Sequence, residues 1–107
     1  MSSPPAHLLV HCTCPADVAA SLARTLVEAG VAACVNAINE IESTYRWDGA
    51  IEQQRETLLL IKTRADRFDA LRASILAHHP YELPEIIAVP VTAAHAPYLD
   101  WINGNLA

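Results

Sequence analysis

The chain has 107 residues, of which 52% are hydrophobic and 18% charged, and its formal net charge is −5 at neutral pH. This length and apolar content predict one domain whose core is large enough to fold without metal or disulfide cross-links. Lysine and arginine together number only 7 and form no cluster, which argues against binding to nucleic acid or to an anionic membrane. No apolar run reaches the ~18 residues that a transmembrane helix needs.

The N-terminus and the cysteines predict where the protein resides. Residues 1–6 lack the charged start and the apolar stretch of a signal peptide, so we expect a cytoplasmic protein. Three cysteines, an odd number, are expected to be thiols and not a disulfide framework. We divide the chain into a disordered N-terminal tail, residues 1–7, and a single domain, residues 8–107.

The first part of the chain predicts a strand followed by a helix. Residues 7–14 are mostly apolar and predict a short, largely buried strand. Pro15 suits the first turn of the next helix, and Val18, Leu22 and Leu26 give that helix one apolar face. Gly30 suits the position just after the last turn.

The middle of the chain predicts a long hairpin. Residues 31–47 do not alternate strictly between apolar and polar, so we expect a bulge or bend at residues 36–39. Asp48-Gly49 is typical of a two-residue turn between strands. The return strand covers residues 50–63, and only its second half is apolar enough to enter the core.

A second helix and a short strand complete the sheet. The pattern from Thr63 to Asp66 resembles a capping box, in which a side chain accepts from the first turn of a helix. The apolar face of this helix is predicted to comprise Phe68, Leu71, Ile75 and Leu76.

His78-His79-Pro80 ends that helix, because proline interrupts the helical hydrogen bonds. Residues 86–91 predict a fourth strand, which Pro90 places at an edge or a bulge. Pro97 then opens a short C-terminal helix.

The order of elements, βαββαβ, predicts an α+β ferredoxin-like fold. It is a four-stranded antiparallel sheet with both long helices on one face, a long hairpin between the second and third strands, and a C-terminal helix. Arms of about 16 residues at roughly 3.3 Å each would be on the order of 50 Å long. Such a hairpin must overhang the domain or bend sharply, and its exposed edges favour pairing within a closed ring of subunits.

This topology brings chemically reactive side chains to one end of the sheet. The end of the first strand carries Cys12 and Cys14, and the second helix ends there at His78 and His79. The loop into the fourth strand adds Glu82 and Glu85 between two prolines. Thiolate and imidazole ligands suit copper and zinc, so these donors predict a metal site.

Several sequence pieces, in this order, resemble the CutA divalent-cation tolerance family and cover nearly the whole chain from residue 8. They are Cys12-Thr13-Cys14-Pro15, Ala33-Cys34-Val35-Asn36, Tyr45-Arg46-Trp47-Asp48-Gly49, Leu60-Ile61-Lys62-Thr63, His79-Pro80-Tyr81-Glu82-Leu83-Pro84-Glu85-Ile86 and Tyr98-Leu99-Asp100-Trp101.

The resemblance implies a PII-like, cytoplasmic homotrimer that is linked to tolerance of copper and other divalent metals. It implies Cys12, one of His78 and His79, and Glu85 as metal ligands. The chain departs from the simplest family pattern in its second thiol, Cys14, in its doubled histidine, and at residues 39–41, where many relatives carry a Pro-Gly turn.

Each of these residues also has a structural interpretation. Cys12 can be a small buried hydrophobe, and His78 or His79 can cap helix carbonyls. Glu85 can accept hydrogen bonds from a nearby turn. The aromatic and basic residues that we assign to subunit contacts or clefts, which can equally serve packing, are Tyr45, Arg46, Trp47, Tyr81 and Trp101.

Three functions remain open at this point. The first is a trimeric protein that binds copper or another divalent cation. The second is a PII-like signalling or scaffold trimer that binds a small molecule or a protein in the clefts between subunits. An enzyme that uses the His/Glu loop as acid and base is the third, but we expect no enzyme, because the chain has no nucleophile–base pair and no Gly-rich phosphate loop.

Overall fold

A computed structural model describes residues 6–107, and residues 1–5 of the predicted tail lie outside the described residues. His7, the last residue of that predicted tail, already belongs to the first strand. The elements are β1 (His7–Cys14), α1 (Ala16–Glu28), β2 (Cys34–Trp47), β3 (Ala50–Arg64), the 3₁₀ turn η1 (Ala65–Arg67), α2 (Phe68–His78), β4 (Ile87–Pro90) and α3 (Ala96–Gly104).

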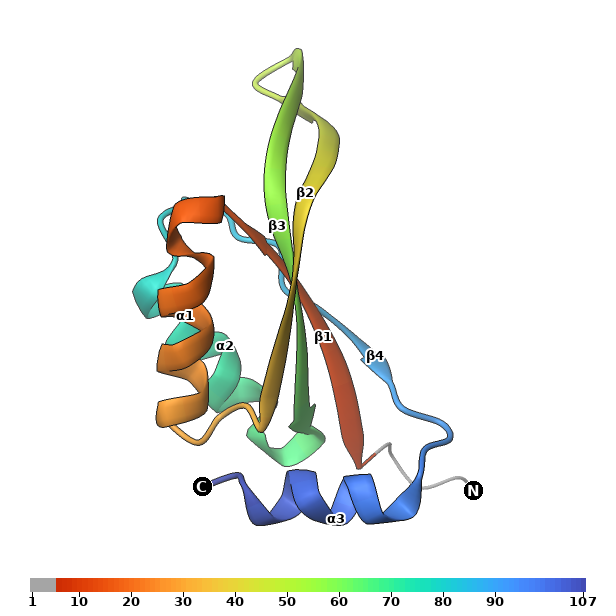
Figure 1. Cartoon of the computed structure of the whole chain (residues 1–107). Coiled ribbons are helices and arrows are strands. Elements are labelled where there is room, and N and C mark those ends of the chain that lie inside the picture. Colours follow the sequence, from red (N-terminus) through yellow and green to blue (C-terminus); the bar gives the residue numbers. More distant parts are fainter. Residues whose placement is uncertain (1–5) are drawn as a thin grey trace.

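The four strands form one antiparallel sheet in the order β2-β3-β1-β4, which confirms the predicted ferredoxin-like plan. Figure 1 shows α1 and α2 together on one face of the sheet, whereas α3 lies across the end where the hairpin strands begin and finish. No helix among residues 6–107 is both long and apolar enough to span a membrane. The strand β4 is an edge strand, which is where Pro90 can be tolerated.

The core lies between the sheet and the two helices α1 and α2. Alternate residues of the central strands point toward the helices, and Val10 of β1 is paired with Ile61 of β3 on this face. Burial of apolar side chains from all these elements is the main favourable contribution to folding. The buried hydrophobic cluster comprises Val10, Cys12, Cys14, Ala19, Leu22, Leu26, Val31, Ala32, Leu59, Ile61, Leu71 and Ile75.

The turn after α1 and the turn at the hairpin tip both have the positive φ angles that suit their glycines. Gly30 has a φ of +71° after α1, and Ala107 packs so closely against it that a Cβ atom has no room there. At the hairpin tip, Asp48 has a φ of 49° and Gly49 a φ of 80°. Two consecutive positive φ values between paired strands define the mirror-image turn that matches the twist of a hairpin.

The predicted irregularity in β2 is a bulge of one residue. The register shifts between Ile38, which pairs with Leu58, and Ile41, which pairs with Glu56. Three steps along β2 therefore match two steps along β3, and Glu40 within the bulge has a φ of 58°. This left-handed backbone is uncommon for a residue other than glycine.

The hairpin overhangs the body of the domain, as predicted (Figure 1). Its arms are shorter than the predicted length, since the longest dimension of the whole molecule is 43 Å. The difference arises because β2 begins only at Cys34 and the strands twist around each other. Residues 31–33 instead form a connection whose Ala33 amide donates to the Lys62 carbonyl.

Three local predictions are wrong. Pro15 precedes α1 as its N-cap and does not lie in its first turn. The capping box at Thr63 does not form, because the hydroxyl of Thr63 donates to the carbonyl of Val31 at 2.8 Å. Leu76 is 45% exposed, so the buried face of α2 consists of Leu71 and Ile75.

Candidate functional site

The predicted convergence at one end of the sheet is present, and His79 connects its parts. His79 follows the last residue of α2 and is 9% exposed. Its Nδ1 accepts a hydrogen bond from the Tyr81 amide at 3.1 Å, so this nitrogen carries no proton. The proton is therefore on Nε2, which donates to the carbonyl of Thr13 in β1 at 2.8 Å. Both nitrogens are occupied, and the ring packs at 4.8 Å against that of Tyr81.

The two adjacent histidines have different environments. His78 is the last residue of α2 and is exposed, and its Nδ1 donates to the Ser74 carbonyl at 2.8 Å. It therefore caps its own helix, which is the structural alternative that the sequence left open. His79 instead fixes the corner between α2, β1 and the loop that follows.

Cys12 and Cys14 both point into the core and are fully buried, which for Cys12 is the structural alternative that the sequence left open. Burial raises the pKa of the Cys12 thiol to about 12, and the nearby Cys14, Glu85 and Glu56 add to this effect. Burial also raises the pKa of Cys14, with contributions from Glu56 and Asp17. Both thiols therefore favour the protonated form, and a metal would have to displace a proton from a buried group in order to bind there.

The donors predicted to bind a metal are close in the fold but are not arranged as one set of ligands. Among residues 6–107, no three His, Cys, Asp or Glu side chains are grouped so that they could hold a metal ion. As arranged, the protonated thiol of Cys12 and the fully hydrogen-bonded imidazole of His79 do not fit a bound metal. Glu85, by contrast, is exposed, so its carboxylate can reach a cation.

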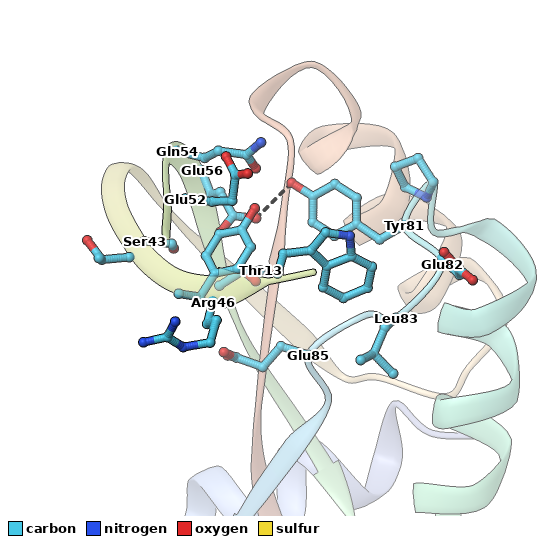
Figure 2. Close-up of a pocket in the computed structure, with 14 residues that line it drawn as sticks. Thr13, Ser43, Arg46, Glu52, Gln54, Glu56, Tyr81, Glu82, Leu83 and Glu85 are labelled. Carbon is cyan, nitrogen blue, oxygen red and sulfur yellow. Dashed lines mark hydrogen bonds between the residues drawn. The ribbon is translucent and has the colours of Figure 1, made fainter. Parts of the chain in front are cut away.

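Beside this corner is an open pocket of about 900 Å³. It lies between the outer half of the hairpin and the loop at residues 80–85, with Thr13 at the end of β1 (Figure 2). Its size is within the range of small-molecule sites. The pocket is lined by Thr13, Ser43, Thr44, Tyr45, Arg46, Trp47, Glu52, Gln54, Glu56, Pro80, Tyr81, Glu82, Leu83 and Glu85.

The bulge in β2 determines which hairpin side chains face the pocket. After the bulge, Ser43 is paired with Gln54 and Tyr45 with Glu52. Directly paired residues point to the same side of a sheet, and so do residues two apart on one strand. Tyr45 and Trp47 therefore share a side with Glu52, and all three line the pocket.

A buried carboxylate connects the hairpin to the loop. Glu56 is only 5% exposed, and its Oε2 accepts a hydrogen bond from the Tyr81 hydroxyl at 2.8 Å (Figure 2). Burial of the Tyr81 phenol, its hydrogen bond to Glu56 and the charge of Glu56 raise the pKa of Tyr81 well above its usual value. Tyr81 therefore stays a hydrogen-bond donor across the physiological pH range.

Four of the five residues predicted for a subunit contact or cleft line this pocket: Tyr45, Arg46, Trp47 and Tyr81. Arg46 lies between Tyr45 and Trp47 on β2, so its side chain starts on the opposite side of the strand from theirs. Figure 2 shows its guanidinium extending away from Tyr81. Trp101 lies elsewhere, on α3, where its ring stacks on Tyr98 at 5.5 Å.

Sequence reasoning missed Glu52, Gln54 and Glu56 as pocket residues. Their spacing of two along the return strand was a usable signal, since it places three polar side chains on one side of β3. The sequence pattern places Glu56 in the polar half of the return strand, which is not apolar enough to enter the core. Its burial becomes evident only when Tyr81 is placed over it.

Known proteins match both the sequence and the fold. A family model described as "CutA1 divalent ion tolerance protein" matches residues 8–105. The chain is 43% identical over 89 residues to a divalent-cation tolerance protein CutA of Thermus thermophilus, covering 83% of this chain and 86% of the relative. It is 47% identical over 92 residues to a CutA homolog of Xenopus laevis, where the match covers 85% of this chain but only 61% of the relative's length.

A solved structure agrees over almost the full length. The crystal structure of CutA1 from the psychrotrophic bacterium Shewanella sp. SIB1 superposes with a TM-score of 0.92 at 42% sequence identity. The superposition covers 97% of this chain and 98% of that one. The similarity thus extends over the whole sheet, its helices and the hairpin that forms one wall of the pocket.

Proposed function

Because the chain belongs to the CutA1 divalent ion tolerance family, we propose that it serves divalent-cation tolerance by binding such cations, copper among them, as a cytoplasmic homotrimer. The proposed activity is binding, and we assign no catalytic step to any residue.

The observation that supports cation binding is the carboxylate lining of the pocket. Glu52, Glu56, Glu82 and Glu85 line it against a single cationic side chain, Arg46. Glu82 and Glu85 are exposed and can move toward an ion, and carboxylate oxygens are suitable ligands for divalent cations. We therefore propose Glu85 as the principal ligand, with Glu82 and Glu52 as its neighbours. The set of Cys12, His78 or His79, and Glu85 stays a prediction that the same experiment tests.

Calorimetric titration with Cu²⁺ tests this proposal. Glu85→Gln should weaken binding markedly because it removes a charge but keeps the shape of the side chain. Glu42→Gln is the matched control, since Glu42 is an exposed glutamate on the hairpin that does not line this pocket. Cys12→Ala should leave the affinity unchanged. Loss of binding in Cys12→Ala with full binding in Glu85→Gln would instead support the thiol ligand.

The homotrimer is supported by the face of the sheet that no long helix covers. Ile38, Ile87 and Val89 are exposed there at 45%, 56% and 41%, and the register places Leu58 and Leu60 between them. Exposed apolar surface of this kind marks a contact surface, and the unpaired edges of β2 and β4 favour pairing with other copies. Sedimentation should give about three times the 11.6 kDa of one chain. A monomer at micromolar concentration would rule the trimer out.

A second candidate function is a PII-like scaffold that binds a small molecule in a cleft. It is favoured by the size of the pocket and by the three aromatic residues in its walls, Tyr45, Trp47 and Tyr81. A thermal-shift screen with nucleotides, small acids and small amines tests it. A shift that is abolished by Trp47→Leu would support the pocket as the binding site, and a screen without any shift would exclude this candidate.

The cytoplasmic location has its own test. Fractionation of cells that express the full-length protein from its own promoter should recover it with cytoplasmic markers. Recovery in a periplasmic, organellar or membrane fraction would disprove this part of the proposal without affecting the cation-binding part.

A further inference from the structure

We infer that the pocket between the hairpin and the loop at residues 80–85 binds an organic ammonium cation, held by aromatic ring faces and by the carboxylates around them. This inference rests on the second candidate function, small-molecule binding in a cleft, and it names the chemical class of the ligand.

The charge of the pocket selects a cation. Four glutamates and one arginine line it, and the guanidinium of Arg46 extends away from Tyr81 (Figure 2). An anionic ligand would meet four glutamates and only one arginine, so nucleotides and small acids are disfavoured.

The aromatic residues give the pocket ring faces that suit an organic cation. Tyr45 and Trp47 are two residues apart on β2 and are 37% and 42% exposed, so part of each ring is accessible to a ligand. Tyr45 on β2 and Tyr81 in the loop both line the pocket, so aromatic rings come from two of its walls. Tryptophan and tyrosine faces attract ammonium groups, most strongly when these carry alkyl substituents and shed water easily.

The hydrogen bond between Tyr81 and Glu56 prepares the site before any ligand arrives. It holds the Tyr81 ring in one orientation, and it keeps the buried carboxylate of Glu56 at the floor of the pocket. A ligand therefore meets a fixed ring and a fixed charge, and little side-chain entropy is lost on binding. Of the other three carboxylates, Glu52 comes from the hairpin, whereas Glu82 and Glu85 come from the loop on the other side of the pocket (Figure 2).

The arrangement of the carboxylates also suits a large cation. A small metal ion needs several donors at about 2.0–2.6 Å, so the exposed Glu82 and Glu85 would have to move toward it, because residues 6–107 contain no ready-made group of His, Cys, Asp and Glu donors. Carboxylates distributed around an opening of about 900 Å³ can still attract a diffuse charge from several sides. An alkylammonium ion is a diffuse charge of this kind.

Binding of choline and of its neutral isostere, 3,3-dimethylbutan-1-ol, tests the inference on the intact protein. The chain has two tryptophans, so Trp101→Phe leaves Trp47 as the only indole reporter. Choline should change the fluorescence of Trp47 in a saturable manner, and the neutral isostere should bind at least about tenfold more weakly because it lacks the charge. Tetramethylammonium and spermidine are titrated alongside.

Variants then assign the binding to the pocket. In calorimetry, Trp47→Leu and Glu52→Gln should each weaken choline binding by about tenfold, whereas Glu42→Gln should not. Sedimentation of each variant confirms an unchanged assembly state.

Equal binding of choline and the neutral isostere would overturn the cation inference but would leave small-molecule binding intact. The inference is also overturned if none of the three cations binds at up to about 10 mM, which is enough to detect millimolar affinity. A screen that is equally silent for all other small molecules would remove the underlying candidate function as well.

Discussion

The phenol of Tyr81 donates to the carboxylate of Glu56 at 2.8 Å, and this bond joins the loop after α2 to the third strand across 25 positions of the chain. Its acceptor is buried and belongs to the overhanging hairpin. The bond is therefore both a tertiary contact and a wall of the pocket, and several measurable consequences depend on it and on the corner beside it.

Tyr81→Phe should destabilise the protein by about 1–3 kcal/mol, because it leaves a buried carboxylate without its donor. Urea unfolding measures the loss. Tyr45→Phe is the matched control, since Tyr45 lines the same pocket but is 37% exposed and should cost little. Equal stability of Tyr81→Phe and wild type would show that the bond does not form in solution.

His79→Ala should destabilise the protein by about 2–4 kcal/mol, since it leaves the Thr13 carbonyl and the Tyr81 amide unpaired at a buried corner. His78→Ala should cost less than about 1 kcal/mol, because His78 is exposed and only caps its own helix. Thermal unfolding of the two variants under identical conditions separates the adjacent histidines. Similar losses would contradict their different roles.

Thiol reactivity should distinguish the three cysteines. Cys12 and Cys14 are fully buried, whereas Cys34 at the start of β2 is half-buried. A thiol reagent added to the native protein should therefore modify Cys34 alone, and all three should react in denaturant. Mass spectrometry after brief alkylation counts and locates the modified residues. Rapid modification of Cys12 in the native protein would show that it is accessible and thus a better ligand candidate than its burial indicates.

Stability should fall in alkaline solution because of the buried thiols. The folded-state pKa of Cys12 is raised from 9.0 to about 12, so the folded protein favours the protonated thiol. This contribution is fully present below pH 9.0 and is lost as the pH rises toward about 12. The free energy of unfolding, measured in urea across this range, should fall less steeply in Cys12→Ala. An identical slope in the two proteins would contradict the burial effect.

Local rules predicted the fold because each element carries its own signal. Asp48 and Gly49 adopt the positive φ values that their pairing predicts, and Gly30 follows α1 as expected. The capping box failed because Thr63 has a better partner, the Val31 carbonyl, which is distant in sequence. The predicted burial of Leu76 was wrong because helical spacing alone does not show how much of the helix surface the neighbouring sheet covers.

The pocket could be predicted only in part. Tyr81 and Glu85 could be predicted as site residues because they lie in a proline-flanked loop. Tyr45 and Trp47 could be predicted because they lie near the hairpin turn. The opposite wall at Glu52 depends on the exact pairing of two long strands, which one sequence does not specify. Likewise, the sequence places His78 and His79 side by side at the end of α2. Which of them caps the helix and which is buried depends on the direction in which the chain turns after α2.

The pairing of the outer hairpin, from Ile41 and Glu56 to the turn, restricts how the arm can change in length during evolution. Deleting the extra residue of the bulge would restore regular pairing without turning Tyr45, because Tyr45 would still lie opposite Glu52 on the continuous strand β3. Removing one residue from each strand would invert both walls together, and removing two from each would shorten the arm while keeping its lining. Beyond the bulge, insertions and deletions should therefore be tolerated in matched steps of two residues per strand and be selected against as steps of one residue per strand.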